Sequence, residues 1–250
     1  MSDSATIALI ALTFLLAGTV KGVIGLGLPT VALALLTATI GLPQAMALLL
    51  APSLVTNLWQ AVVGGHGRVI LQRIWPFLLA ATATVWIGAA ALTRVDVALL
   101  STLLGVLLAT YALLNLQRPR FAVSPPQEIW VGPLIGSVNG VLTGMTGSFV
   151  VPGVLFLQAI GLPRDLLVQA MGMLFSASTV ALALALGGNR LLSVELGVLS
   201  TLAVLPAIIG MMIGQRVRRS MSESRFRRLF FLALLALGVY IASGSLARLT

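Results

Sequence analysis

The sequence predicts an all-α polytopic membrane protein built from two homologous halves. Of its 250 residues 59% are hydrophobic and only 8% are charged, and the mean hydropathy is +1.10. Soluble domains carry about 25% charged residues, so this composition indicates a chain that lies in a bilayer. The triplet Gly-Leu-Pro occurs at 41–43 and again at 161–163, which indicates an internal repeat. The length allows about 8 full spans, or about 10 segments if two of them are broken or re-entrant helices.

The charge balance and the cysteine count restrict the classes of function that the protein can have. The net charge is +9, but the arginines lie between apolar runs, which indicates membrane topology rather than nucleic-acid binding. Because the chain has no cysteine, disulfides, thiolate metal sites and cysteine nucleophiles are excluded. The N-terminus lacks the positively charged region of a cleaved signal peptide, so we expect the first apolar run to stay in the mature protein.

The first predicted half covers residues 5–116. Its first apolar run ends at Lys21, the only lysine, and no further charge follows until Arg68. A helix of that length, at about 1.5 Å per residue, would far exceed the ~30 Å hydrocarbon layer, so the chain must turn. The first Gly-Leu-Pro triplet supplies a helix-ending glycine and a first-turn proline. We expect a short piece at 28–40 and spans at 43–63, 74–93 and 97–116.

A polar, proline-rich linker at 117–128 precedes the second half, residues 129–247. The apolar run 129–163 is again too long for one span, and a glycine-rich stretch interrupts it. Full spans are expected at 166–188, 196–215 and 229–247. Gly27 and Gly147 are separated by the same offset as the two Gly-Leu-Pro triplets. We interpret the chain as one transmembrane transporter domain with two repeats; the alternative is a chance repetition in a chain rich in glycine and leucine.

The arginines distinguish two ways of threading the broken segments. If each segment crosses the membrane once, the chain has eight spans, the halves are parallel, and the two faces carry similar numbers of arginines. If each returns to its own side, one face carries most of them, as the positive-inside rule requires of the cytoplasmic face. Each half then has an odd number of crossings, which makes the halves inverted repeats with both termini outside. In this favoured threading the cytoplasmic arginines are Arg68, Arg73, Arg118, Arg120, Arg164 and those from Arg216 to Arg228.

The two glycine-rich breaks, near 21–29 and 139–148, form the candidate substrate-binding site. A lysine beside broken backbone in an apolar run is costly unless it faces a polar cavity or a partner. Broken helices also offer backbone N–H groups to an anion. We interpret Lys21 as the counter-charge and its neighbours as donors in a site formed where the two breaks meet near the midplane. The candidates are Lys21, Gly22, Gly25, Gly27, Asn57, Asn139, Thr143, Gly144, Thr146, Gly147 and Ser148.

Other roles for these residues stay open. Lys21 fits a topology anchor whose ammonium reaches the interface, and Gly140 with Gly144 fits a helix-packing motif. Asn57, like Gln60, Gln169, Ser176 and Ser178, fits a hydrogen bond between helices. No carboxylate lies inside a predicted span, so we see no carboxylate proton relay, and we expect neither an enzyme nor a metal or cofactor site.

Two stretches resemble a known family. VKGVIGLGLPTVALALL and NGVLTGMTGSFVVPGVLFL, each followed by Gly-Leu-Pro, are similar to the sulfite exporter TauE/SafE family, and the resemblance covers nearly the whole chain. It implies a multi-pass permease of the bacterial cytoplasmic membrane that moves sulfite, an organosulfonate or a related sulfur-containing anion. We expect export, with the small anion and the lipid bilayer as partners and no nucleic acid; a homodimer is left open. The alternatives are a membrane assembly or sensor subunit without transport, or a permease for a non-sulfur organic anion.

Overall fold

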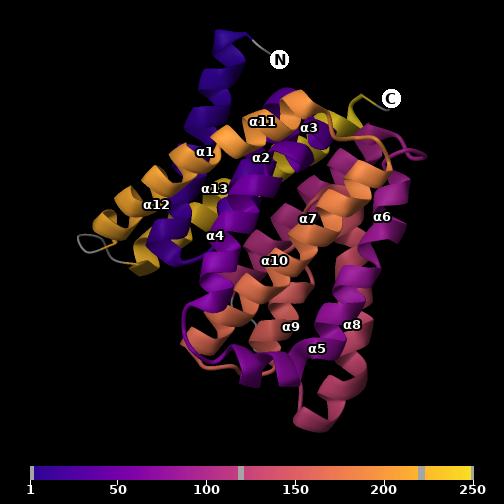
Figure 1. Ribbon diagram of the computed structural model, residues 1–250, viewed down its shortest axis with the longest axis vertical. Coiled ribbons are helices and arrows are strands. Elements are labelled where there is room, and N and C mark those ends of the chain that lie inside the picture. The colour runs from indigo at the N-terminus through magenta and orange to yellow at the C-terminus, as the bar shows by residue number, and fades with distance from the viewer. Residues whose placement is uncertain (1–2, 118–120, 219–222, 249–250) are drawn as a thin grey trace. The chain divides into compact units, whose positions relative to one another are not determined.

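The computed structural model describes residues 3–117, 121–218 and 223–248. Arg118, Arg120 and Arg219, which entered the charge argument, lie outside these ranges. Within them the structure is all-α, as predicted, with thirteen helices and no strand (Figure 1). The helices are α1 (Ser4–Ile24), α2 (Leu28–Ile40), α3 (Leu42–Leu48), α4 (Leu50–Val62), α5 (Gly67–Ala83), α6 (Val85–Ala91), α7 (Val97–Gln117), α8 (Pro125–Thr146), α9 (Gly153–Ala159), α10 (Arg164–Gly188), α11 (Val194–Leu202), α12 (Val204–Val217) and α13 (Glu223–Leu246).

Six helical stretches in the described residues are long and apolar enough to cross a membrane. They are Ser4–Ile24, Gly67–Ala91, Val97–Gln117, Arg164–Gly188, Val194–Val217 and Ser224–Leu246. A seventh span results if α3 and α4, which are bent by 45° at the residue between them, cross together. The apolar helix α2 has only 13 residues, as the sequence predicted. The multi-pass architecture is therefore confirmed, while eight full spans remain a prediction.

Both breaks begin later than the sequence predicted. Lys21 lies in the last turn of α1, which ends at Gly25, where φ is +80° and the N–H donates to the Lys21 carbonyl at 2.8 Å. Asn139 lies well inside α8, which ends at Gly147, where φ is +73° and the N–H donates to the Thr143 carbonyl at 2.7 Å. Glycine inside a helix costs only about 1 kcal/mol, so the earlier glycines do not end these helices. The helices end instead at the glycines with positive φ, Gly25 and Gly147.

The chain forms two compact units, and each unit takes helices from both predicted halves. Unit 1 contains residues 1–52, 96–118 and 192–250, and thus α1–α3, α7 and α11–α13. Unit 2 contains residues 53–95 and 119–191, and thus most of α4 with α5, α6 and α8–α10. The sequence halves are therefore not the units of packing.

In unit 1, α1 runs alongside α12 in the same direction (Figure 1). A Cβ built on Gly18 would overlap the Ala207 carbonyl oxygen, and one on Gly22 would overlap the Met211 carbonyl oxygen, so residue numbers rise together along the two helices. The first break follows directly, and a Cβ on Gly27 would lie 3.4 Å from the ring of Phe230 in α13. The break thus lies at the end of unit 1 where α12 ends and α13 begins, rather than halfway along α1 and α12.

The second pair of helices in unit 1, α7 and α13, is antiparallel. A Cβ on Gly105 would lie 2.6 Å from the Gly238 carbonyl oxygen, and Tyr111 meets Phe231 edge-on with ring centroids 5.5 Å apart. The last turn of α7 therefore lies beside the first turns of α13. In the favoured threading both of these ends are cytoplasmic.

In unit 2, α8 runs alongside α5 and α6 in the same direction (Figure 1). Cβ atoms built on Gly136, Gly140 and Gly144 would overlap, in order, the carbonyl oxygens of Phe77, Ala81 and Val85. The start of α8 falls inside the predicted linker, because Ser124 and Gln127 form a capping box ahead of residue 129. An ion pair between Arg73 and Glu128, at 2.6 Å, joins α5 to the first turn of α8.

Candidate functional site

The predicted site residues divide between the two units. Unit 1 holds Lys21, Gly22, Gly25 and Gly27. Unit 2 holds Asn57, Asn139, Thr143, Gly144, Thr146, Gly147 and Ser148. A composite site that joins the two breaks therefore stays a prediction, and each group is described in its own unit.

The first break contains a buried lysine and glycines with different roles. Lys21 is only 4% exposed, whereas an anchoring lysine keeps its ammonium group in water. Gly22 packs against the α12 backbone, since its Cβ would also lie 2.9 Å from the Gln215 nitrogen, and this contact accounts for the glycine without a ligand. A Cβ on Gly25 would have no heavy atom within 4 Å, so what Gly25 provides is the left-handed turn that ends α1.

In the second break, two of the predicted donors already have partners. The Thr143 hydroxyl donates to the Ser148 carbonyl at 2.9 Å, and the Thr146 hydroxyl donates to the Leu142 carbonyl at 2.7 Å. The Ser148 N–H in turn donates to the Thr146 hydroxyl oxygen at 3.2 Å. The two threonines therefore hold the loop after α8 in shape, and their hydroxyl hydrogens are not available to a ligand in this structure. Gly144 packs on Val85 and is explained in the same way as Gly22.

Asn139 and Ser148 present donors that no described residue accepts from. Asn139 is fully buried, and its Oδ1 accepts a hydrogen bond from the Gly153 N–H at 2.8 Å, at the start of α9. This contact directs Nδ2 the other way, and Nδ2 has no hydrogen-bond partner among the described residues; the same holds for the buried Ser148 Oγ. A buried polar group without a partner costs about 1–3 kcal/mol, so such groups need an explanation.

A third unused donor lies on the neighbouring helix α10. The Cβ position of Gly153 would be within 3.0 Å of both Asn139 and the Leu174 side chain, so these groups meet at one place. Ser178 follows Leu174 by one helical turn and lies on the same face of α10. Ser178 is fully buried, and its Oγ has no partner among the described residues. The unused donors of the second break and of α10 therefore belong to one neighbourhood of unit 2.

Helix α4 carries further buried polar groups in unit 2. It meets α10 near its C-terminal end, where Ala61 packs on Gly172. Asn57 and Ser53 lie one and two turns before Ala61 on α4. Ser53 and Asn57 are fully buried, and the hydroxyls of Ser53 and Ser176 have no partner among the described residues.

The structure separates two kinds of polar residue that the sequence grouped together. Gln60 donates to the Val168 carbonyl at 2.7 Å and Gln169 donates to the Ala61 carbonyl at 2.8 Å, which confirms their role in joining helices. Ser176 and Ser178 make no such bond with the described residues. Ser53 was missed by sequence reasoning, although its position one turn before Asn57 on the same helical face was visible.

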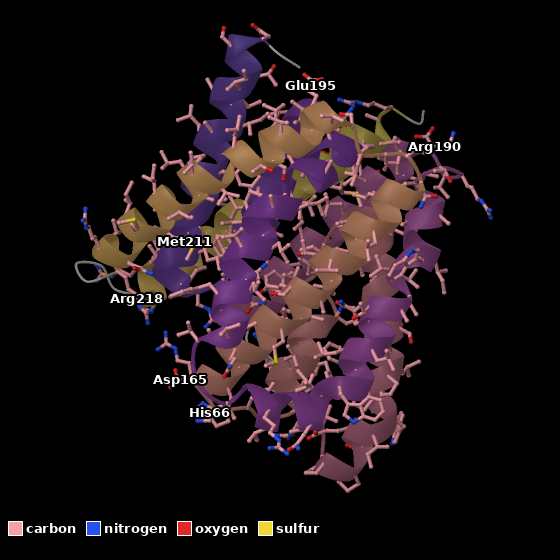
Figure 2. All side chains as sticks on the ribbon, in the orientation of Figure 1. His66, Asp165, Arg190, Glu195, Met211 and Arg218 are labelled. Carbon is pink, nitrogen blue, oxygen red and sulfur yellow. The ribbon has the colours of Figure 1, made fainter. Side chains whose placement is uncertain are left out.

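The described carboxylates lie at helix ends, as predicted. Asp165 and Glu195 are in the first turns of α10 and α11, and His66 lies in the loop before α5 (Figure 2). The unused donors of unit 2 are hydroxyl and amide groups, which can hold the oxygen atoms of a small anion.

Comparison with known protein families finds a match over nearly the whole chain. The family model described as "Sulfite exporter TauE/SafE" matches residues 10–241, which include both breaks, both Gly-Leu-Pro triplets and all the donors of unit 2 named above. No significant match was found among curated proteins or among solved structures. Since the family model covers nearly the whole of this apolar, multi-helix chain, the protein belongs to the sulfite exporter TauE/SafE family of membrane transporters.

Proposed function

We propose that this protein is a permease that exports a small sulfur-containing oxyanion, sulfite or an organosulfonate, across the bacterial cytoplasmic membrane. The observation that carries the proposal is a set of buried donors in unit 2 that have no partner in the part of the chain that the structure describes. Asn139 Nδ2, Ser148 Oγ and Ser178 Oγ come from three different segments and are buried. A transport site has to keep donors unoccupied by the protein so that a solute can use them, and the cost of doing so is recovered when the solute binds.

The chemistry of these donors supports an oxyanion as the substrate. A sulfite or sulfonate group presents three oxygen atoms, each of which accepts hydrogen bonds. Phe149, which follows Ser148 in the chain, packs its ring against that of Phe175 with centroids 5.9 Å apart, so apolar surface accompanies the donors. Because these hydroxyl and amide donors are neutral, they can bind an anion without any transfer of protons. Because the cell interior is electrically negative, export of the anion is favoured by about 2.3 kcal/mol per charge per 100 mV.

Lys21 is proposed as the counter-charge of the transport route. Its 4% exposure in the last turn of α1, directly before a broken segment, supports a role inside the protein rather than at the interface. A buried cation directly before a broken helix marks a solute path in many transporters.

We further propose that the two halves are inverted repeats. The contacts of α1 with α12 recur between α8 and α5–α6: Gly18 and Gly22 meet the carbonyls of Ala207 and Met211 as Gly140 and Gly144 meet those of Ala81 and Val85. The residue numbers of the two glycines on α1 differ from those of the two glycines on α8 by one constant amount. The residue numbers of the two carbonyls on α12 differ from those of the two on α5–α6 by a second constant amount. The amount found for the glycines also pairs Gly25 with Gly147, the two left-handed glycines that end the broken helices, in place of the Gly27–Gly147 pairing used for the sequence repeat.

The α7–α13 pair supports inversion rather than a parallel repeat. These helices are the last of each half, and their contacts are reciprocal: the Cβ of Gly105 would lie 2.6 Å from Gly238 O, and that of Gly238 would lie 2.8 Å from Gly105 O. Equivalent helices that pack antiparallel with reciprocal contacts are related by a two-fold axis perpendicular to them. For spanning helices that axis lies in the membrane plane, which is the symmetry of inverted-repeat transporters.

A flux assay tests the proposed function. The full-length protein is reconstituted in liposomes loaded with sulfite, an alkanesulfonate or a carboxylate of similar size, and efflux is measured under an inside-negative potential. The proposal requires efflux of a sulfur oxyanion above that of protein-free liposomes and faster than that of the carboxylate. Efflux equal to the protein-free rate for every anion would favour an assembly or sensor subunit, and a preference for the carboxylate would favour a permease for organic anions.

A further inference from the structure

Unit 1 contains a cavity of about 520 Å³ that the transport site does not involve. It lies between the end of α7, which contributes Asn115 and Leu116, and the first turns of α13. The α13 side chains that line it are Ser224, Arg225, Arg227, Arg228, Phe231 and Leu232. Three arginines therefore face one space, and no carboxylate is among these eight lining residues.

One of these arginines is held in place by neutral groups. Arg227 Nη2 donates to Asn115 Oδ1 at 3.4 Å, and its guanidinium carbon lies 5.6 Å from the centroid of the Phe231 ring. Asn115 is fixed because its Nδ2 donates to the Tyr111 carbonyl at 2.9 Å, and Phe231 is fixed by its contact with the Tyr111 ring. These contacts orient the guanidinium, and the two side chains that hold it, Asn115 and Phe231, are both neutral.

The surface next to the cavity is apolar. Leu232, which lines the cavity, is 46% exposed, and Leu229 on α13 and Leu113 on α7 are 63% and 43% exposed. A cationic cavity that borders exposed leucines on membrane-spanning helices matches a molecule with an anionic head and hydrocarbon chains.

We propose that this cavity binds the phosphate headgroup of an anionic phospholipid, whose acyl chains lie along α7 and α13. The arginines would contact the phosphodiester oxygens, for which guanidinium groups are well shaped. The positive-inside argument places this end of unit 1 at the cytoplasmic leaflet, whose surface is negatively charged. The site is independent of the transport function, because it contains none of the proposed substrate donors.

Lipid binding to the purified full-length protein in detergent tests the proposal. The probes are phosphatidylglycerol and phosphatidylcholine, measured by native mass spectrometry and by the shift in melting temperature. The wild type should bind phosphatidylglycerol in preference to phosphatidylcholine, and added salt should weaken that binding. At about 1 kcal/mol per arginine, the double variant Arg225→Gln/Arg228→Gln should bind phosphatidylglycerol roughly thirtyfold more weakly and phosphatidylcholine equally well.

The matched control is Arg94→Gln/Arg248→Gln, which removes the same charge from exposed positions on the predicted outer face and should bind both lipids as the wild type does. Equal affinity of the wild type for both lipids, or a loss in the control as large as that in the cavity variant, would overturn the proposal. A third probe, glycerol 3-phosphate without acyl chains, distinguishes the source of the phosphate. If it displaces phosphatidylglycerol at equal concentration, the cavity is a site for free phosphate and not for lipid.

Discussion

Replacing Ser178 by alanine should lower transport without lowering stability, and this combination tests the transport site directly. Ser178 is fully buried on α10, and its hydroxyl has no partner among the described residues. Alanine has almost the same shape and removes a buried polar group whose isolation costs about 1–3 kcal/mol. The free energy of unfolding should therefore stay the same or rise by about 1 kcal/mol.

The same change removes one hydrogen bond to the substrate. A hydrogen bond to a charged group contributes about 1.5–3 kcal/mol, so the apparent affinity for the oxyanion should fall roughly ten- to 150-fold. The assay is anion efflux from proteoliposomes over a range of substrate concentrations, divided by the amount of folded protein. Thermal unfolding in detergent gives the stability of the same samples.

Ser137→Ala is the matched control. Ser137 is on α8, half a turn before Asn139, and its hydroxyl donates to the Pro133 carbonyl at 2.9 Å, so it should make no contact with a substrate. Its alanine variant should transport normally. If Ser178→Ala is less stable than the wild type while normalised efflux is unchanged, the hydroxyl serves packing, and the reasoning that assigns unused donors to a substrate is wrong.

Three further changes test other parts of the structure. Lys21→Ala should weaken the apparent affinity for the anion roughly ten- to 150-fold, from a loss of about 1.5–3 kcal/mol, while Lys21→Arg keeps part of it; normal flux per folded molecule in the alanine variant would leave Lys21 as an anchor. Gly144→Ala should lower the thermal stability by about 1–3 kcal/mol because its Cβ would overlap Val85, whereas Gly188→Ala, which has open space, should not. Cysteines at positions 124 and 193 should be labelled from the cytoplasm and from the outside respectively, and labelling of both from one side would exclude the favoured threading.

Much of the fold follows from the sequence because long apolar runs leave few alternatives to helix. The positions of the breaks do not follow, since a glycine that ends a helix and one that packs inside it look alike. Gly25 and Gly147 end helices through a positive φ, whereas Gly22 and Gly144 stay helical because a neighbouring backbone lies against them. That distinction depends on contacts with helices far away in the chain.

Only part of the candidate site could be predicted from the sequence, and the reason is related. Asn139 and Ser148 were identified as donors, and the structure leaves each with an unused polar atom. Thr143 and Thr146 looked equivalent to them, but their hydroxyls bond to carbonyls within five residues. Sequence shows which side chains can donate and not which have already found an acceptor, and for the same reason Ser178 was interpreted as a link between helices.

The interleaving of the two halves has a consequence for how the protein is made. α1 leaves the ribosome long before α12, yet α12 is its main packing partner. At about 5–20 residues per second, synthesis of the intervening chain takes on the order of ten seconds or more. Through that interval Lys21 has no α12 beside it in the bilayer, so nascent α1 must be retained by the insertion machinery or lie shallow until α12 has been made. Biogenesis should therefore be the step most sensitive to truncation of the C-terminal helices, with α1 as the segment that is lost first.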